Sequence, residues 1–194
     1  MDIFLQQIIN GLVQGSIYAL VALGYTMVYG IMGLINFAHG DVYMVGVFTS
    51  LTVLSVTGTL ESKDPGKIVF GLILALVIAI VVCAVLNATI ERLAYKRLRN
   101  APRLAPLISA IGMSFIIENV GLMWAAQAWL VPSFGTTGGA SQKVFPDMLG
   151  VLFTSMGWDV NLLASSGLAL RLTIKDLLVI ILAVTLMTGL YLFV

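Results

Sequence analysis

Glycine and polar residues gather within the apolar N-terminal part of the chain, in the stretch GIMGLINFAHGDVYMVG at residues 30–46. Glycine loosens a helix, and a polar side chain inside a bilayer needs a hydrogen-bonding partner. Backbone that leaves the helical conformation at membrane depth is tolerated only where protein buries it or where it lines a wet cavity. These residues could therefore line a path for a polar solute, and the candidates are Gly30, Gly33, Asn36, His39 and Gly40.

The same residues also have a purely structural interpretation. Asn36 and His39 can pair with backbone groups that are left free where a helix breaks, and the sequence leaves both interpretations open. Asp41 stands directly before an apolar run, so we expect it to cap a helix that begins at Val42.

A second polar position lies in the apolar run at residues 107–130. Glu118 and Asn119 occupy its middle, and an acid near the centre of a membrane helix costs about 2.5 to 3.5 kcal/mol. The nine Leu, Ile, Val and Phe residues of this run supply only about 4 kcal/mol of favourable insertion energy. We therefore expect Glu118 and Asn119 to face the interior of a helical bundle, in a structural role.

Patterns of catalytic and cofactor-binding residues are missing from the sequence. His39 is its one histidine and Cys83 its one cysteine, which excludes a disulfide within the chain and indicates neither a nucleophile–base pair nor a metal cluster. The segment GTTGGASQK does not have the glycine spacing of a GxxxxGK[ST] phosphate-binding loop. Charged residues make up only 10% of the chain, too few for the surface of a soluble enzyme or a nucleic-acid binder. We expect no enzyme activity, no cofactor, no metal site and no nucleic-acid partner.

Long charge-free runs indicate the elements that hold these residues: the helices of an all-α, polytopic integral membrane protein surrounded by lipid. A bilayer crossing needs about 20 apolar residues. We expect one transmembrane domain over residues 1–194, a helical bundle with a broken or re-entrant helix near residues 25–40. Its five expected spans are residues 3–24, 42–60, 68–90, 107–130 and 177–194.

The distribution of positive charge predicts the orientation. Residues 91–103, the basic segment, carry five Lys or Arg against one acid, whereas residues 61–67 and 131–176 are balanced. The positive-inside rule puts the basic segment in the cytoplasm and the other two loops outside. If residues 25–40 re-enter the membrane, Met1 lies outside, and this is the arrangement we favour. Trp124 and Trp129 near the outer end of their span are expected as interfacial anchors.

The first span carries a small-residue face. Gly11 and Gly15 have GxxxG spacing, and Ser16 lies beside them. Small residues let another helix approach closely, so we expect helix packing at this face.

Two motifs resemble one known family. The stretch NGLVQGSIYALVALGYTMVYGIMGLINFAHGDVYMVG at residues 10–46 resembles the opening motif of permease subunits of branched-chain amino-acid ABC importers. The stretch ERLAYKRLRNAPRLAPLISAIGMSFIIEN at residues 91–119 resembles the family's next motif in order and spacing. The resemblance implies a multi-pass permease of the bacterial inner membrane that moves leucine, isoleucine and valine into the cytoplasm. It also implies three kinds of partner: a second homologous permease subunit, two cytoplasmic ATPase subunits and an external solute-binding protein.

Two alternatives stay open: a permease of the same family for urea or short amides, and a secondary transporter or channel. Because the chain ends at Val194 inside an apolar run, we also expect it to be the N-terminal part of a longer permease, without the loop that docks the ATPase.

Overall fold

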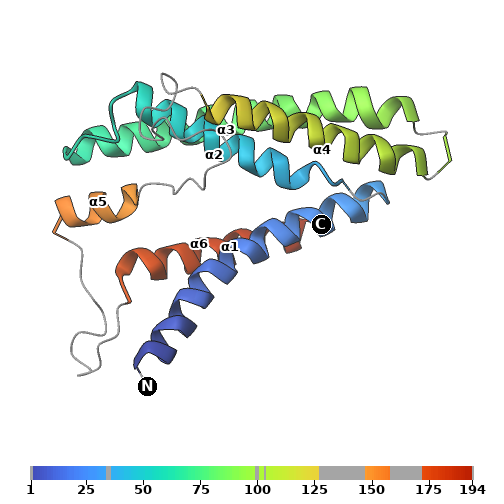
Figure 1. The fold of residues 1–194 in the computed structure, drawn as a ribbon. Coiled ribbons are helices and arrows are strands. Elements are labelled where there is room, and N and C mark those ends of the chain that lie inside the picture. The colour runs from blue at the N-terminus through green and yellow to red at the C-terminus, as the bar shows by residue number, and fades with distance from the viewer. Residues whose placement is uncertain are drawn as a thin grey trace. The chain divides into compact units, whose positions relative to one another are not determined.

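The structure is a computed structural model that describes residues 2–33, 36–98, 101–102, 104–126, 147–157 and 172–193. Its elements are helical, which confirms the all-α class (Figure 1). In chain order they are α1 (Asp2–Met32), α2 (His39–Val56), α3 (Pro65–Ile90), the π-helix η1 (Glu91–Tyr95), the 3-10 helix η2 (Lys96–Leu98), α4 (Leu104–Ala125), α5 (Met148–Ser155) and α6 (Ile174–Phe193).

Within the described ranges, four helical segments are long and apolar enough to cross a membrane: Ile3–Gly30, Pro65–Tyr95, Leu104–Ala125 and Ile174–Leu192. The fifth expected span, 42–60, corresponds to α2, which has 18 residues and carries Asp41 in its first turn. It is not among the four and stays a prediction. Helix α5 has eight residues, too few to cross a bilayer.

Local sequence explains where the α2–α3 hairpin turns. Helix α2 ends in a Schellman motif in which Gly58 has a φ of 63° and the Thr59 N–H donates to the Leu54 carbonyl at 3.0 Å. Helix α3 begins at Pro65, because the Asp64 side chain accepts a hydrogen bond from the Gly66 N–H at 3.1 Å.

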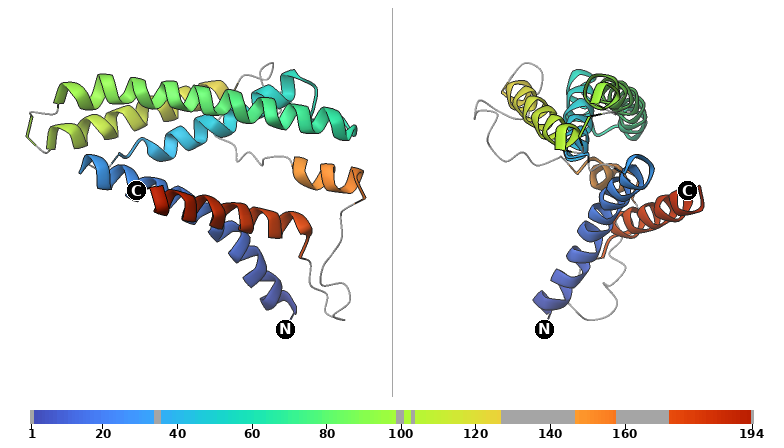
Figure 2. Two further views of the ribbon diagram at one scale, coloured as in Figure 1. Left: turned by 180° about the vertical axis from the view of Figure 1, so that it is seen from behind. Right: turned by 90° about the vertical axis from the view of Figure 1, so that its right-hand side faces the viewer.

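The chain divides into two compact units. One of them, Leu34–Met148, contains α2, α3, η1, η2 and α4, and α2 packs against both α3 and α4 (Figure 2). Its main apolar cluster joins the beginning of α2, the end of α3 with η1, and α4. The cluster consists of Ala38, Val42, Val45, Ile90, Ala94, Tyr95, Ala110 and Ile117.

The other unit comprises Met1–Gly33 and Leu149–Val194, so the N-terminal and C-terminal segments of the chain share it. Helices α1 and α6 pack against each other in it and cross at an angle (Figure 2).

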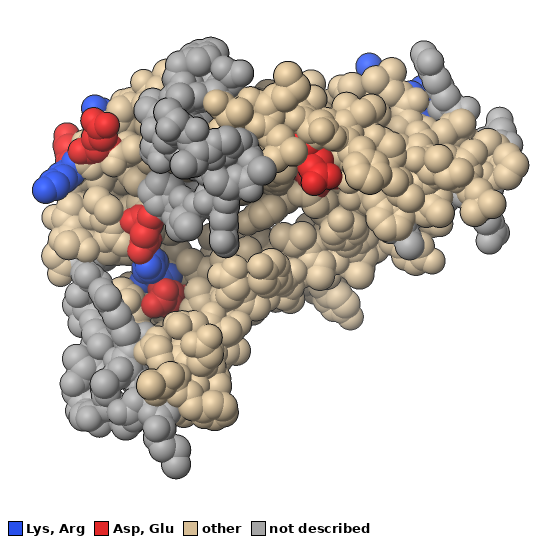
Figure 3. Space-filling view, in the orientation of Figure 1, with Lys and Arg blue, Asp and Glu red and all other residues tan. Residues whose placement is uncertain are grey.

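Apolar side chains dominate the exposed faces of the helices. On α3, exposed residues include Phe70, Leu76 and Ile80, with exposed fractions of 65%, 60% and 59%. Charged side chains are few on the face drawn in Figure 3. Such helix faces match a lipid environment better than water.

Candidate functional site

The predicted helix break lies at residues 33–38. Helix α1 continues to Met32, so residues 25–32 extend this helix and do not form a separate re-entrant segment. Gly33 then takes a φ of 63°, and its N–H donates to the Tyr29 carbonyl at 2.8 Å. A glycine tolerates this left-handed conformation at a helix end without steric cost, so the break begins at the glycine.

The Asn36 side chain accepts two hydrogen bonds at the break. Its Oδ1 accepts one hydrogen bond from the Ala38 N–H at 3.1 Å and another from the Tyr95 hydroxyl at 2.8 Å. The Asn36 carbonyl also accepts from the His39 N–H at 3.2 Å, and the residue is buried. These contacts agree with the structural interpretation of Asn36, in which its side chain pairs with a backbone group at the helix break. Sequence reasoning missed Tyr95, whose position inside a basic segment gave no sign of a buried role.

The expectation that Asp41 caps a helix beginning at Val42 is wrong. Helix α2 begins at His39 and its N-cap residue is Ala38, because the Asn36 side chain already accepts the Ala38 N–H. Asp41 therefore lies in the first turn of α2, where its negative charge interacts favourably with the helix dipole. Its carboxylate accepts a hydrogen bond from the Ser114 hydroxyl of α4. Asp41 thus ties α2 to α4.

The other candidate path residues fall in both units. His39 and Gly40 are half-buried in the first turn of α2, next to Asn36, so three of the five candidates share one unit. Gly30 and Gly33 belong to α1 and its end, in the unit with α6, and both are exposed there.

Glu118 and Asn119 are both exposed on α4 within this unit, and their place in the interior of a larger bundle stays a prediction. The Asn119 amide donates to the Phe115 carbonyl of its own helix at 2.7 Å. The reason is helix rotation, because α4 packs through Ile117 and Gly121. Glu118 is one residue on from Ile117, which turns it by about 100° away from that face.

Trp124 has a role within the unit. Its indole N–H donates to the Thr52 hydroxyl at 3.2 Å, and its ring centroid lies 6.4 Å from that of Phe48 in a tilted arrangement. The residue therefore joins α4 to α2. Trp129 lies outside the described residues, as do residues 131–146 and 158–171 of the predicted outer segment.

Close helix contacts occur at glycines other than the expected ones. Around Gly11 and Gly15, no described atom lies within 4 Å of the position of an added Cβ, and the Ser16 hydroxyl donates to the Val13 carbonyl at 2.7 Å. By contrast, a Cβ at Gly71 would collide with Thr59, and one at Gly121 would lie 2.5 Å from Met44 Cε. Small residues do permit close helix packing here, on α3 and α4.

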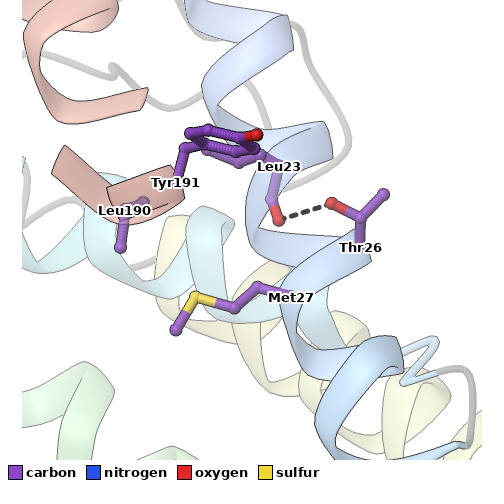
Figure 4. A pocket seen from close by; sticks show the side chains of 5 residues that line it. All are labelled: Leu23, Thr26, Met27, Leu190 and Tyr191. Carbon is purple, nitrogen blue, oxygen red and sulfur yellow. Dashed lines mark hydrogen bonds between the residues drawn. The ribbon is translucent and has the colours of Figure 1, made fainter. Parts of the chain in front are cut away.

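A small apolar pocket lies between α1 and α6. Its volume is about 170 Å³, and its lining residues are Leu23, Thr26, Met27, Leu190 and Tyr191 (Figure 4). The Thr26 hydroxyl donates a hydrogen bond to the Leu23 carbonyl at 2.8 Å, so its proton is not available to a polar solute in the pocket. Within the described residues, no group of three His, Cys, Asp or Glu side chains could hold a metal ion.

Comparison with known proteins gives the family of the chain. The model of the branched-chain amino acid transport system permease component matches residues 7–194. The chain belongs to this family. It is a multi-pass membrane permease component of a bacterial ABC transport system, and the expectation that it is not an enzyme is confirmed.

Curated relatives share nearly half of the aligned residues. The chain is 46% identical over 123 residues to the high-affinity branched-chain amino acid transport system permease protein BraD of Pseudomonas aeruginosa, covering 62% of this chain and 38% of the relative. It is 48% identical over 119 residues to the permease protein LivH of Escherichia coli K12, covering 60% and 37%. The matched part therefore spans a little over a third of the relatives' length. No solved structure matches the chain.

Proposed function

We propose that the chain forms part of the solute path of an ABC importer that moves leucine, isoleucine and valine into the cytoplasm. The observation that carries this proposal is the family match over residues 7–194. The relatives BraD and LivH are named for high-affinity transport of branched-chain amino acids, which supports the substrate class.

The helix break lies at the cytoplasmic end of the α2–α3 hairpin in this proposal. The basic segment at the end of α3 faces the cytoplasm because positive charge is retained there. The Tyr95 hydroxyl of this segment donates a hydrogen bond to Asn36 Oδ1, so the break lies at the same depth in the membrane as the basic segment. The loop at residues 57–64 is then external. If α1 crosses the bilayer once, Met1 lies outside.

Partners supply the energy and cover the exposed polar face of α4. We assign them as a second homologous permease subunit, two cytoplasmic ATPase subunits and an external solute-binding protein. Exposed Glu118 supports a protein neighbour, because an acid facing lipid at the centre of a span costs about 2.5 to 3.5 kcal/mol. ATP-driven closure of the ATPase pair would re-orient the bundle, so that the path opens alternately to each side.

The proposed path residues have different roles: the glycines shape the path, Asn36 stabilises the backbone, and His39 contacts the solute. Gly30, Gly33 and Gly40 add no side chain to the path, and the φ of 63° at Gly33 turns the backbone away from α1. Asn36 holds the start of α2 in place through its two hydrogen bonds. His39 lies beside it in the first turn of α2 and offers a polar ring to a passing solute.

The test uses the complete permease assembled with its partners in proteoliposomes. We expect ATP-dependent uptake of radiolabelled leucine, with competition by valine and isoleucine. Asn36→Leu and Gly33→Leu should abolish uptake while co-purification of the ATPase is retained. Asn87→Leu on the exposed face of α3 is the matched control and should leave uptake near normal.

Other outcomes decide against parts of the proposal. Competition by urea or acetamide but not by valine would assign a different substrate of the same family. Uptake driven by a proton or sodium gradient without ATP would make the protein a secondary transporter. If Asn36→Leu and Gly33→Leu prevented assembly, residues 33–36 would be packing positions.

A further inference from the structure

The helical geometry changes where α3 enters the basic segment. The α-helix ends at Ile90, a π-helix follows over Glu91–Tyr95, and a 3-10 helix follows over Lys96–Leu98. π-Helical turns are rare and often occur at functional sites. Ala94 and Tyr95 are buried here, whereas Arg92 and Lys96 are exposed. The segment therefore presents charges on one side and a buried tyrosine on the other.

The buried tyrosine reaches the break between α1 and α2. Its hydroxyl donates to Asn36 Oδ1 at 2.8 Å, and the same oxygen accepts the Ala38 N–H. Both donors and the acceptor are in the interior: Tyr95 is 6% exposed, Asn36 8% and Ala38 0%. Ala38 and Tyr95 also belong to one apolar cluster.

The Tyr95 hydroxyl is therefore a buried polar link between the basic segment and residues 36–38. Hydrogen bonds between buried groups are costly to leave unmade, so Tyr95 stabilises the position of residues 36–38. We propose that Tyr95 is a positioning residue for transport: it holds residues 36–38, at the start of α2, against the end of α3. This inference rests on the proposed function.

The test measures exposure of the break and does not depend on a substrate. In the complete permease with Cys83→Ser, a cysteine at Ala38 is labelled by a membrane-impermeant maleimide in inside-out vesicles. Tyr95→Phe removes the hydroxyl and keeps the ring. We expect it to raise the labelling rate of Ala38→Cys about three- to tenfold, the effect of losing one buried hydrogen bond.

Two controls separate local release from general loosening. Tyr43→Phe removes a hydroxyl from an exposed tyrosine of α2 and should leave the labelling rate of Ala38→Cys unchanged. Leu54→Cys, buried near the external end of α2, is probed with a membrane-permeant maleimide, which reaches the interior of the vesicles, and should stay slow to label in the Tyr95→Phe background.

Equal labelling of Ala38→Cys in Tyr95→Phe and in the parent would overturn the inference, and so would faster labelling at both Ala38→Cys and Leu54→Cys. Leucine uptake by the same vesicles tests the proposed function separately. A parent that does not import leucine, combined with faster labelling in Tyr95→Phe, would refute the substrate and keep the positioning role. Normal leucine import by the parent, combined with unchanged labelling in Tyr95→Phe, would refute the positioning role and keep the substrate.

Discussion

Replacing Gly71 with alanine is expected to strain the turn end of the α2–α3 hairpin, where Gly71 lies close to Thr59. The added Cβ would lie 2.7 Å from Thr59 Cγ2, 3.0 Å from Thr59 Cβ, and closer still to Oγ1. Thr59 cannot easily turn away, because it is 1% exposed and its hydroxyl lies 2.7 Å from that of Thr57. A β-branched side chain also has few accessible rotamers.

Two opposing terms determine the size of the effect. Alanine in place of glycine inside a helix stabilises it by about 0.5 to 1 kcal/mol. Overpacking a filled interior costs about 1 to 3 kcal/mol, so the free energy of unfolding should fall by about 0 to 2.5 kcal/mol in Gly71→Ala.

Two other glycines provide matched controls. At Gly112 no described atom lies within 4 Å of the added Cβ, so Gly112→Ala should show only the helix-stabilising term. At Gly121 the nearest atom is the flexible end of Met44, at 2.5 Å, which can move aside. Gly121→Ala should therefore be close to neutral.

The assay follows heating of the purified protein in detergent with a thiol-reactive dye. Cys83 is half-buried and its thiol donates to the Val42 carbonyl at 3.6 Å, so it reacts when α2 and α3 separate. We expect Gly71→Ala to unfold at the lowest temperature of the three variants, and Thr59→Ala in the same chain to restore much of the loss. A Gly71→Ala protein as stable as Gly112→Ala would refute the predicted collision.

Three further predictions concern contacts and topology. Trp124→Phe should lower the free energy of unfolding by about 0.5 to 1.5 kcal/mol, because Thr52 loses its donor; the same loss in a Thr52→Val background would contradict this. Ser114→Ala removes a hydrogen bond to a carboxylate and should cost about 1.5 to 3 kcal/mol in thermal unfolding, whereas an unchanged midpoint would show that Asp41 does not need Ser114. In a cysteine-free background, Asn100→Cys should be labelled only from the cytoplasmic side, and labelling from outside would reverse the orientation.

Much of the site could be located from the sequence, but its internal bonding could not. The spacing of Gly33, Asn36 and His39 was enough to predict a helix break, because glycine and polar residues in an apolar run cannot continue a lipid-facing helix. The partner of Asn36 was not predictable, since Tyr95 is 59 residues away and lies among the charged residues of the basic segment.

The sequence by itself determined the membrane character, the helical class and the family. Long apolar runs can be stable only in lipid, and there a helix satisfies its own backbone, so composition decides class without tertiary information. Charge distribution likewise predicts orientation from sequence alone.

Only the tertiary structure decided which side chains meet. Asp41 pairs with Ser114 across 73 residues, and Glu118 is exposed on α4 although its neighbour Ile117 is buried. Both results depend on how each helix is rotated about its axis. A nearly uniform apolar helix carries little information about rotation, because many faces bury equally well in lipid and in protein. Close contacts such as Gly71 with Thr59 then select one rotation, and they exist only once the helices are packed.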